Sequence, residues 1–498
     1  MILFVLLSIP LLACCLAVLA RTRRWMETIH LVSAAGSLIA ALFLVAQVLR
    51  QGSVSQTNGF LYADALSALV ALLTAFVYLA CAPYAIGYLR RDEVDGTLAV
   101  AGDYDGLLRR LRMFYSLMPL FCFCMFLVVV ANNLGVMWIA IEGTTLASIF
   151  LVTFYGRPNS LEAAWKYAMI GGVGLSMALF GTVLTYYSAH QVMGTDSLSA
   201  LNWSVLALQA PHFDKTVMRL AFILILLGYG TKAGLAPMHT WKPDAYCEAP
   251  VPVGALMSTA VLNCAVYGLA RYYVLTVGCL GPAFASNLLI LFGLLSVGVA
   301  VPFIMVQRSS RRLLAYSSID HGGIMVLGLG FGGMLGVLGM LLHMTYHTAI
   351  KPLLFLAVGN VQQHTGNDAL RRGASGLVHV LPISAPLFLL GALAVTGTPP
   401  FGMFQSEFMV LRAGFAAQHL GLSILFVICV VMIFCGFFSH VAQLVLGPPS
   451  GAPREFGSHW KTYPVIGLAL VVIVMGFWLP APLYQLIERA AHIVEVHP

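Results

Sequence analysis

The chain has 498 residues, of which 60% are hydrophobic and only 9% are charged, whereas about a quarter of the residues of a soluble domain are charged. These values exclude a soluble globular protein, a disordered chain and a nucleic-acid-binding protein. The net charge of +7 is small for this length and predicts no basic binding patch. The composition instead predicts a polytopic membrane protein, in which the few polar residues inside the bilayer are placed for a reason.

Fourteen apolar segments follow one another along the chain, each long enough to form a transmembrane helix. They lie near residues 2–20, 28–49, 64–89, 113–131, 134–155, 163–187, 216–241, 253–276, 284–306, 313–332, 336–358, 380–411, 420–446 and 462–485. The connections between them leave no room for a soluble domain. The sequence therefore predicts an all-α membrane protein of about 14 transmembrane helices, surrounded by the lipid bilayer.

The positive charges between these segments predict the orientation of the chain. If the N-terminus faces outward, 16 Lys and Arg residues fall on the inner side and six on the outer side. The inner set includes Arg371, Arg372 and Arg454, and the outer set includes Arg271. Because inner loops carry an excess of positive charge, we expect both termini on the outer face of a bacterial inner membrane, which requires an even number of spans.

The four remaining cations are Lys166, Lys232, Lys242 and Lys351, all within or beside apolar segments. Arginine effectively never loses its proton, whereas a buried lysine shifts readily between its neutral and charged forms. The choice of lysine therefore indicates positions where a charge can be lost inside the membrane. The alternative is a lysine that extends its ammonium group to the membrane surface, and this alternative is strongest for Lys242 and Lys166.

Carboxylates and chain interruptions mark two further places inside the membrane. Glu142 lies near the middle of its span, where an ionisable group costs roughly 2.5–3.5 kcal/mol on insertion scales. Lys232 and His239 lie in a stretch interrupted by glycines and prolines, and Glu407 follows a second interruption at 396–402. Irregular backbone at membrane depth is tolerated where it lines a cavity or is buried in protein. These residues therefore predict a hydrated path for protons or ions, although packing between helices remains an alternative for each carboxylate.

The two interruptions fall in the seventh and twelfth predicted spans. Because these spans are five helices apart and five is odd, equivalent helices of two such units point in opposite directions, as in inverted repeats around an ion path. The paired interruptions therefore point to two inverted repeats around an ion path.

A third polar group lies between the interruptions. His343, His347 and Lys351 are four residues apart and therefore share one face of a helix, which predicts a relay of titratable groups. Asp320 and His321 begin a glycine-rich span near the inner surface, where a structural role and a role in transport both remain open.

Nothing in the sequence predicts a cofactor, a metal or a catalytic centre. The ten cysteines lie mostly in apolar runs without the paired spacing of a zinc or iron–sulfur site, and no phosphate-binding loop is present. We expect no cofactor in this chain.

Several motifs together resemble the antiporter-like proton-channel subunits of complex I and its relatives. The resemblance rests, in order along nearly the whole chain, on Glu142-Gly-Thr-Thr, Ala-Ala-Trp-Lys166-Tyr, Lys232 through Trp241-Lys242-Pro243-Asp244-Ala245, Ser317-Ser318-Ile319-Asp320-His321, His347 through Lys351, and Pro399 through Glu407-Phe408. Within that family, Thr-Thr-Leu-Ala-Ser after Glu142 and Glu162-Ala-Ala-Trp-Lys166-Tyr look most like hydrogenase-4 component F.

The resemblance implies two five-helix inverted repeats, at 113–276 and 277–446, between an N-terminal three-helix segment at 1–112 and a last span at 447–498. It also implies that Glu142 pairs with Lys232 and that a central hydrophilic axis continues to Glu407. A glutamate rather than a lysine at this last position is closer to subunit M of complex I than to subunit L. The chain departs from the pattern at Asn263, where many relatives carry a lysine or histidine. Asparagine cannot titrate, so either water or His239 bridges the gap, or the relay runs differently here.

The sequence thus predicts a proton-translocating subunit of an energy-converting redox complex, either hydrogenase-4-like or NADH:quinone oxidoreductase-like. Its expected partners are other membrane subunits and a peripheral arm that is nickel–iron hydrogenase-like or quinone-reducing. The residues expected to translocate protons are Glu142, Lys232, Glu407, Lys351, His347, His343, Lys166, His239, Lys242, Asp320 and His321. The alternatives are a cation/proton antiporter module, a subunit of a proton-driven uptake complex without redox chemistry, and a purely structural membrane anchor.

Overall fold

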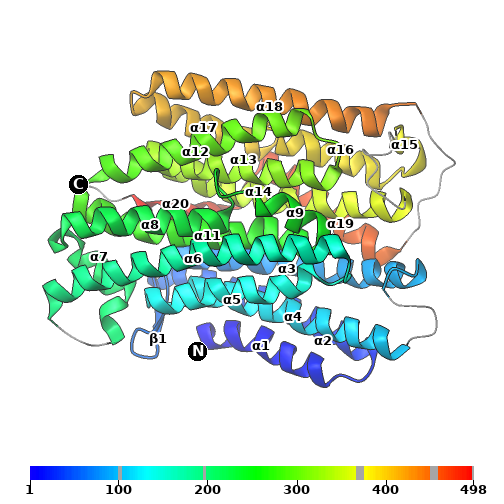
Figure 1. The fold of residues 1–498 in the computed structure, drawn as a ribbon, viewed down its shortest axis with the longest axis horizontal. Coiled ribbons are helices and arrows are strands. Elements are labelled where there is room, and N and C mark those ends of the chain that lie inside the picture. Colours follow the sequence, from blue (N-terminus) through cyan, green and yellow to red (C-terminus); the bar gives the residue numbers. More distant parts are fainter. Residues whose placement is uncertain (99–103, 195–197, 366–374, 449–457, 496–498) are drawn as a thin grey trace.

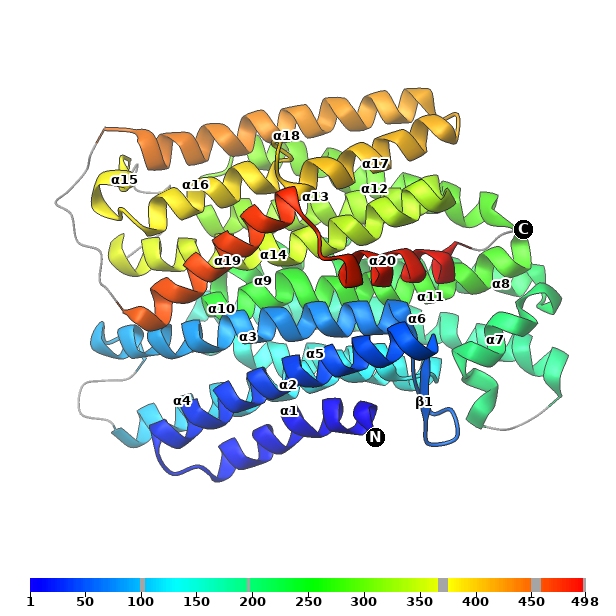
Figure 2. The ribbon, with the colours of Figure 1, turned by 180° about the vertical axis from the view of Figure 1, so that it is seen from behind.

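The computed structural model of the chain describes residues 1–98, 104–194, 198–365, 375–448 and 458–495. Arg371, Arg372 and Arg454, which the orientation count assigns to the inner side, lie outside these ranges. Long helices run side by side, with α1 (Ile2–Leu19) at one edge of the bundle and α18 (Leu420–Leu446) at the other (Figure 1, Figure 2). The start of α1 and the end of α20 (Ala481–Val494) lie toward the same end of the bundle.

The N-terminal part contains α1, α2 (Arg23–Gln51) and α3 (Ala65–Val94). A short antiparallel hairpin, β1 (Val54–Gln56) and β2 (Leu61–Ala63), joins α2 to α3, and the helical prediction did not include it. The carboxylate of Asp64 accepts a hydrogen bond from the Ser67 backbone N–H at 3.0 Å and so starts α3.

The next part of the chain begins with three long helices, and its elements are α4 (Tyr104–Val130), α5 (Leu134–Val152), α6 (Pro158–Met193), η1 (Leu198–Leu201), α7 (Trp203–Gln209), η2 (Ala210–His212), α8 (Lys215–Ala233), α9 (Trp241–Glu248), α10 (Val251–Leu256), η3 (Met257–Val261) and α11 (Leu262–Leu280). Asn133 and Asp214 cap the N-termini of α5 and α8 by accepting backbone N–H groups. The segment η3 is a π-helical turn, and together with α10 and α11 it forms one continuous helix.

The remaining elements are α12 (Pro282–Met305), α13 (Ser310–Phe331), α14 (Gly333–Thr365), α15 (Leu377–Val380), α16 (Ser384–Val395), α17 (Gly402–Ala416), α18, α19 (His459–Phe477) and α20. The prediction of one uninterrupted last span at 462–485 is wrong. Helix α19 ends at Phe477 because Pro480 and Pro482 cannot donate the backbone hydrogen bonds that would continue it. Helix α20 then packs on α3 and α14 (Figure 2).

Eleven helices within the described ranges are long and apolar enough to cross a membrane, and the chain is therefore a multi-pass membrane protein. Helices α13 and α14 are also long, but they carry Asp320, His321, His343, His347 and Lys351 in their middle. The pair α16–α17 is divided by residues 396–401. With these three segments the number of crossings would reach the fourteen that the sequence predicts, and that number stays a prediction.

The most deeply buried helices carry polar or charged side chains in their middle. Every residue of α14 from Gly336 to Val361 is buried, and the α10–α11 helix is buried throughout its apolar part. By contrast, only about a third of the apolar window is buried in α1 and α18 (33% each). This arrangement follows from the solvent, because lipid accepts apolar surface at no cost whereas charged groups need protein partners.

A buried ion pair removes Arg271 from the six positive charges that were counted on the outer side. Arg271, which the count places on the outer surface, lies within α11 with its side chain buried. Its guanidinium donates two hydrogen bonds of 2.7 Å to the carboxylate of Asp64 and one of 3.0 Å to Ser67. It also lies over the Trp203 ring at 4.1 Å. A permanent charge is suited to this position because a planar guanidinium binds a carboxylate with both oxygens at once.

We expect Arg271→Met to lower the free energy of unfolding by about 3–5 kcal/mol, because the Asp64 carboxylate would remain buried without its partner. Thermal unfolding of the full chain in detergent measures this loss. The matched control is Arg219→Met, which removes an exposed arginine from α8. Equal melting temperatures for the two variants would contradict the prediction.

Candidate functional site

The first interruption separates α8 from α9. Helix α8 ends at Ala233, Gly234 has a positive φ of 74°, and α9 begins at Trp241. The last carbonyl groups of a helix have no partner within it, and here side chains from α9 supply donors. The indole of Trp241 donates to the Thr231 carbonyl at 2.9 Å, and Lys242 Nζ donates to the Ala233 carbonyl at 2.8 Å. The interruption is therefore held by the residues that follow it.

Lys232 lies in the last turn of α8 with its side chain buried. Its ammonium donates to Thr145 Oγ1 at 2.8 Å and to the Tyr167 hydroxyl at 2.9 Å, and it lies 5.2 Å from the centre of the Tyr167 ring. The C-terminal end of a helix also favours a positive charge. Hydroxyl groups from α5 and α6, rather than a carboxylate, thus bind this lysine.

Glu142 is half-buried on α5, one helical turn before Thr145. Its Oε2 is buried and has no hydrogen-bond partner within the described part of the chain. The structure therefore places the Lys232 ammonium against α5, one helical turn from Glu142. Thr145, rather than Glu142, binds the ammonium. The buried carboxylate oxygen of Glu142 is therefore a position where an ordered water molecule can bind.

Lys242 connects the first interruption to α13. Besides the Ala233 carbonyl, its Nζ donates to the Ser318 carbonyl at 3.2 Å, and the residue is only 1% exposed. The alternative that Lys242 extends to the membrane surface is therefore wrong. The reason is that the Ala233 carbonyl at the end of α8 and the Ser318 carbonyl of α13 bind the ammonium inside the protein.

Lys351 of α14 is fully buried, and its side chain contacts α13 next to the position that binds Lys242. Its ammonium donates to Ser317 Oγ at 2.9 Å and to the Leu314 carbonyl at 3.1 Å. Ser317 and Ser318 are adjacent residues, so α13 binds Lys242 and Lys351 at successive positions. Asp320 follows on the same helix, and its buried Oδ1 has no partner among the described residues.

A histidine pair continues the polar line toward α17. His321 Nδ1 lies 3.1 Å from His343 Nε2, and His343 Nδ1 lies 3.0 Å from Ser406 Oγ. The ring of His347 lies 5.2 Å from that of His321, and both of its nitrogens are buried without a partner within the described ranges. Hydrogen bonds therefore connect His321 of α13, His343 of α14 and Ser406 of α17, and His347 lies beside them.

The line reaches the second interruption at Glu407, the residue after Ser406. Helix α16 ends at Val395 and α17 begins at Gly402, with Glu407 buried in the second turn of α17. Gly397 has a φ of 68°, and the Glu407 carboxylate occupies the space that a side chain there would need. We call the titratable residues described so far the central axis: Glu142, Lys232, Lys242, Asp320, His321, His343, His347, Lys351 and Glu407.

Asn263, the departure from the family pattern, is buried in α11 just after the π-helical turn. Its Nδ2 donates to Thr348 Oγ1 at 2.8 Å, while Oδ1 has no partner in the described chain. Thr348 follows His347 on α14. The amide thus contacts the same helix as the histidine pair without being able to carry a proton, and its free oxygen is a position for a water molecule.

Lys166 and His239 are not part of the central axis. The Lys166 side chain is 45% exposed and forms ion pairs with Glu162 at 2.7 Å and Asp244 at 3.0 Å. His239 is buried, its ring faces Tyr316, and its Nδ1 has no partner within the described ranges. Lys166 therefore agrees with the alternative of a surface lysine, although it lies at the edge of a cavity.

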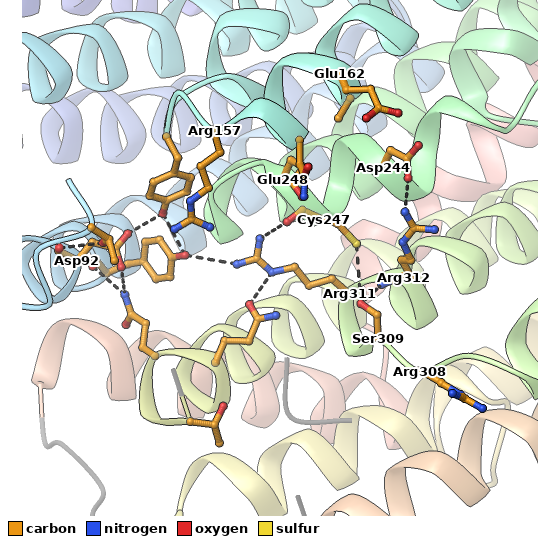
Figure 3. Close-up of a pocket in the computed structure, with 18 of the residues that line it drawn as sticks. Asp92, Arg157, Glu162, Asp244, Cys247, Glu248, Arg308, Ser309, Arg311 and Arg312 are labelled. Atoms are coloured by element: carbon orange, nitrogen blue, oxygen red, sulfur yellow. Dashed lines mark hydrogen bonds and ion pairs between the residues drawn. The ribbon is translucent and has the colours of Figure 1, made fainter. Parts of the chain in front are cut away.

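That cavity, of about 1350 Å³, opens at the end of the bundle where α9 and α13 begin. Figure 3 shows charged side chains converging on it from several helices. Asp244 forms ion pairs with both Lys166 and Arg312. Arg311 donates to the Cys247 carbonyl at 2.6 Å and to the Ala249 carbonyl at 2.9 Å. Because Asp244 lines this polar cavity and follows Lys242 by two residues, the cavity lies close to Lys242 of the central axis.

The predicted site residues do not include the neutral residues that bind the charged ones, namely Thr145, Tyr167, Ser317, Ser318 and Ser406. A signal for them existed, because each is adjacent in sequence or on a helix face to a predicted residue. Thr145 is three residues after Glu142, Tyr167 follows Lys166, and Ser406 precedes Glu407. Hydroxyl groups are common in membrane helices, however, so this spacing alone identifies no partner.

The fold and the central axis define a class of protein: a multi-pass membrane protein with titratable groups buried across its helices. Residues 131–433 match the family described as NADH:quinone oxidoreductase/Mrp antiporter, transmembrane. A hydrogenase-4 component F homolog of Methylacidiphilum infernorum is 33% identical over 459 residues, which cover 92% of each chain. The chain belongs to this family.

Further comparisons agree with this assignment. NADH-quinone oxidoreductase subunit N of Desulforudis audaxviator is 33% identical over 302 residues, 58% of each chain. A chain of the archaeal membrane-bound sulfane sulfur reductase has the same fold, with a TM-score of 0.87, 23% identity and coverage of 99% of this chain and 97% of that chain. A chain of the Mrp complex from Dietzia sp. DQ12-45-1b gives a TM-score of 0.83 at 18% identity, with coverage of 99% and 97%.

The position of Lys242 generates a prediction at Gly234. A side chain there would adopt an unfavourable positive φ, which costs roughly 1–2 kcal/mol, and its Cβ would also lie 2.6 Å from Lys242 Cδ. We expect Gly234→Ala to lower the melting temperature more than Gly96→Ala, whose φ of 69° is similar but whose Cβ would meet no atom within 4 Å. Equal losses would show that Lys242 does not depend on this glycine.

Proposed function

We propose that this chain is a proton-translocating, antiporter-like subunit of an energy-converting membrane complex, and that protons move along the central axis. The observation that carries the proposal is the burial of three lysines, each bound by neutral oxygens rather than by a fixed carboxylate. An ammonium held by carbonyl and hydroxyl groups can lose its proton without leaving an unpaired charge behind.

The residues divide the path into steps. Glu142 and Lys232 exchange a proton with water near the first interruption, and Lys242 and Lys351 pass the charge along α13. The pair of His321 and His343 then carries it to Glu407. His239, with an unpartnered ring nitrogen, and water at Asn263 are suited to bridge the gaps, while Lys166 and the cavity beside α9 collect protons at the surface.

The proposal extends to partners and surroundings. The relatives belong to hydrogenase-4-like and NADH:quinone oxidoreductase-like assemblies by name, and we propose that this chain likewise joins other membrane subunits and a peripheral redox arm. That arm is nickel–iron hydrogenase-like or quinone-reducing. The chain itself holds no cofactor, lies in a bacterial inner membrane and keeps both termini on the outer face. The inverted repeats at 113–276 and 277–446 are part of the same proposal.

We expect Lys351→Arg to lower the initial rate of proton transfer at least about tenfold, because a group that must gain and lose a proton contributes 10²–10⁴-fold and arginine keeps its proton. Proton movement in sealed vesicles containing the assembled complex measures this rate, and quinone or hydrogenase activity reports assembly. Lys215→Arg, at the exposed start of α8, is the matched control. Normal transfer in Lys351→Arg would mean that the charge is fixed and that the proposal fails.

A second candidate function is a cation/proton antiporter or proton-driven uptake module without redox chemistry, favoured by the likeness to a chain of the Mrp complex. Mass spectrometry of the subunits that purify with the full chain, together with sodium flux in vesicles without redox substrates, separates the two. Redox subunits and no sodium flux support the proposal, and sodium flux without redox subunits supports the alternative. Normal transport after Glu142→Gln and Lys232→Ala would instead favour a structural anchor.

A further inference from the structure

A second group of buried polar side chains lies outside the central axis, between α2, α3 and α4. Glu27, His30, Ser33 and Ser37 follow one another along α2 at spacings of three to four residues, so they share one face, and all four are buried. Tyr78 of α3 and Tyr115 of α4 contact this face, and Thr74 is buried one turn before Tyr78 on α3. We call these seven residues the His30 cluster.

His30 lies at the centre of the cluster and has no exposed surface. Its Nδ1 lies 3.4 Å from the Tyr78 hydroxyl, which donates to Ser33 Oγ at 3.3 Å. Its ring centre lies 5.3 Å from that of Tyr115. One ring nitrogen thus faces a hydroxyl chain while the other, Nε2, faces a different direction, which allows the ring to accept a proton at one nitrogen and release one at the other.

Four atoms of the cluster are buried without a hydrogen-bond partner in the described part of the chain: His30 Nε2, Ser37 Oγ, Thr74 Oγ1 and Tyr115 OH. Buried polar atoms in proteins are nearly always hydrogen-bonded, and ordered water is the usual partner where side chains do not suffice. A single such atom would carry little weight. Four of them, contributed by three adjacent helices around one face of α2, indicate a hydrated interior.

Glu27 places an ionised group at one end of the cluster. Its carboxylate accepts hydrogen bonds from Arg23 Nε at 2.7 Å and Arg90 Nη2 at 2.5 Å, and its side chain is 6% exposed. Because two arginines bind its carboxylate, we expect Glu27 to fix the structure at this end of the cluster rather than to carry the proton. From Glu27 to Ser37 the helix rises about 15 Å, roughly half of the hydrocarbon thickness.

We propose that the His30 cluster is a second, water-filled proton-carrying site, which admits protons from the Glu27 end of the bundle to about mid-membrane. In each transfer His30 gains one proton from water at Nε2 and gives the proton on Nδ1 to the Tyr78 oxygen, while Tyr78 passes its own hydroxyl proton to Ser33 and Ser33 passes its own to water. A flip of the imidazole ring then restores the first tautomer. The site belongs to the N-terminal helices and shares no residue with the central axis.

The first test is a map of the full chain in its membrane complex at a resolution that shows ordered water. We expect water molecules bridging His30 Nε2, Tyr115 and Thr74. Direct side-chain packing around His30 without water would overturn the proposal.

The second test compares His30→Gln with His30→Phe in sealed vesicles of the assembled complex. Glutamine keeps polar groups that can hydrogen-bond Tyr78 and water but cannot gain and lose a proton, whereas phenylalanine removes both properties. We expect both variants to lower the rate of proton transfer about tenfold or more with assembly retained. The matched control, His492→Gln, changes an exposed histidine of α20 and should leave the rate unchanged.

The outcomes separate this site from the central axis. Normal transfer in His30→Gln together with a loss in Lys351→Arg would overturn the second site alone. A loss in His30→Gln with normal transfer in Lys351→Arg would support the second site and overturn the role of the axis. A loss confined to His30→Phe would mean that the cluster only stabilises the packing of α2, α3 and α4, and the proposal would fail.

Discussion

The ammonium group of Lys242 rests on the Ala233 carbonyl, and the rest of the polar interior depends on this kind of contact. A helix that ends inside a membrane leaves carbonyl groups that water cannot reach, and each costs several kcal/mol if it stays unpaired. A buried ammonium has the same difficulty with the opposite sign. The helix-end carbonyl therefore accepts the hydrogen bond that the buried ammonium must donate. Because Gly234 has no side chain, the Lys242 side chain can reach this carbonyl.

The same constraint explains the order of the bundle from its centre outward. Lys351 needs the Ser317 hydroxyl and the Leu314 carbonyl, and the histidine pair needs Ser406 on a third helix. Helices that carry such groups must be surrounded by others, so α11 and α14 lie innermost. The predominantly apolar helices α1 and α18 can face lipid. Thus the position of a helix within the bundle follows from how many of its side chains require protein partners.

The sequence was sufficient to predict the helical membrane class, the two interrupted segments and the charged residues near them, because rare charges in apolar segments are conspicuous. It could not predict which neutral groups bind those charges. Tyr167 binds Lys232 across 65 residues of sequence, and only the packing of α6 on α8 reveals this. Arg271 was misplaced for a related reason: its partner Asp64 lies 207 residues away, so the arginine resembled an ordinary loop charge. The break at Pro480 was visible as prolines, but hydropathy averaged over a long window concealed it.

The oxygen atoms that hold Lys242 and Lys351 have a consequence for ion selectivity. Backbone carbonyl and hydroxyl oxygens are also the kind of ligand that a dehydrated metal cation binds. In this chain each such pair of oxygens is already occupied by a cation that is covalently attached to the protein. A metal ion would have to displace the lysine ammonium from these oxygens and would be repelled by its positive charge. A proton, by contrast, can move between groups that are already present. Under the proposed function, the ammonium groups of these lysines therefore occupy the oxygen ligands that a second cation would need.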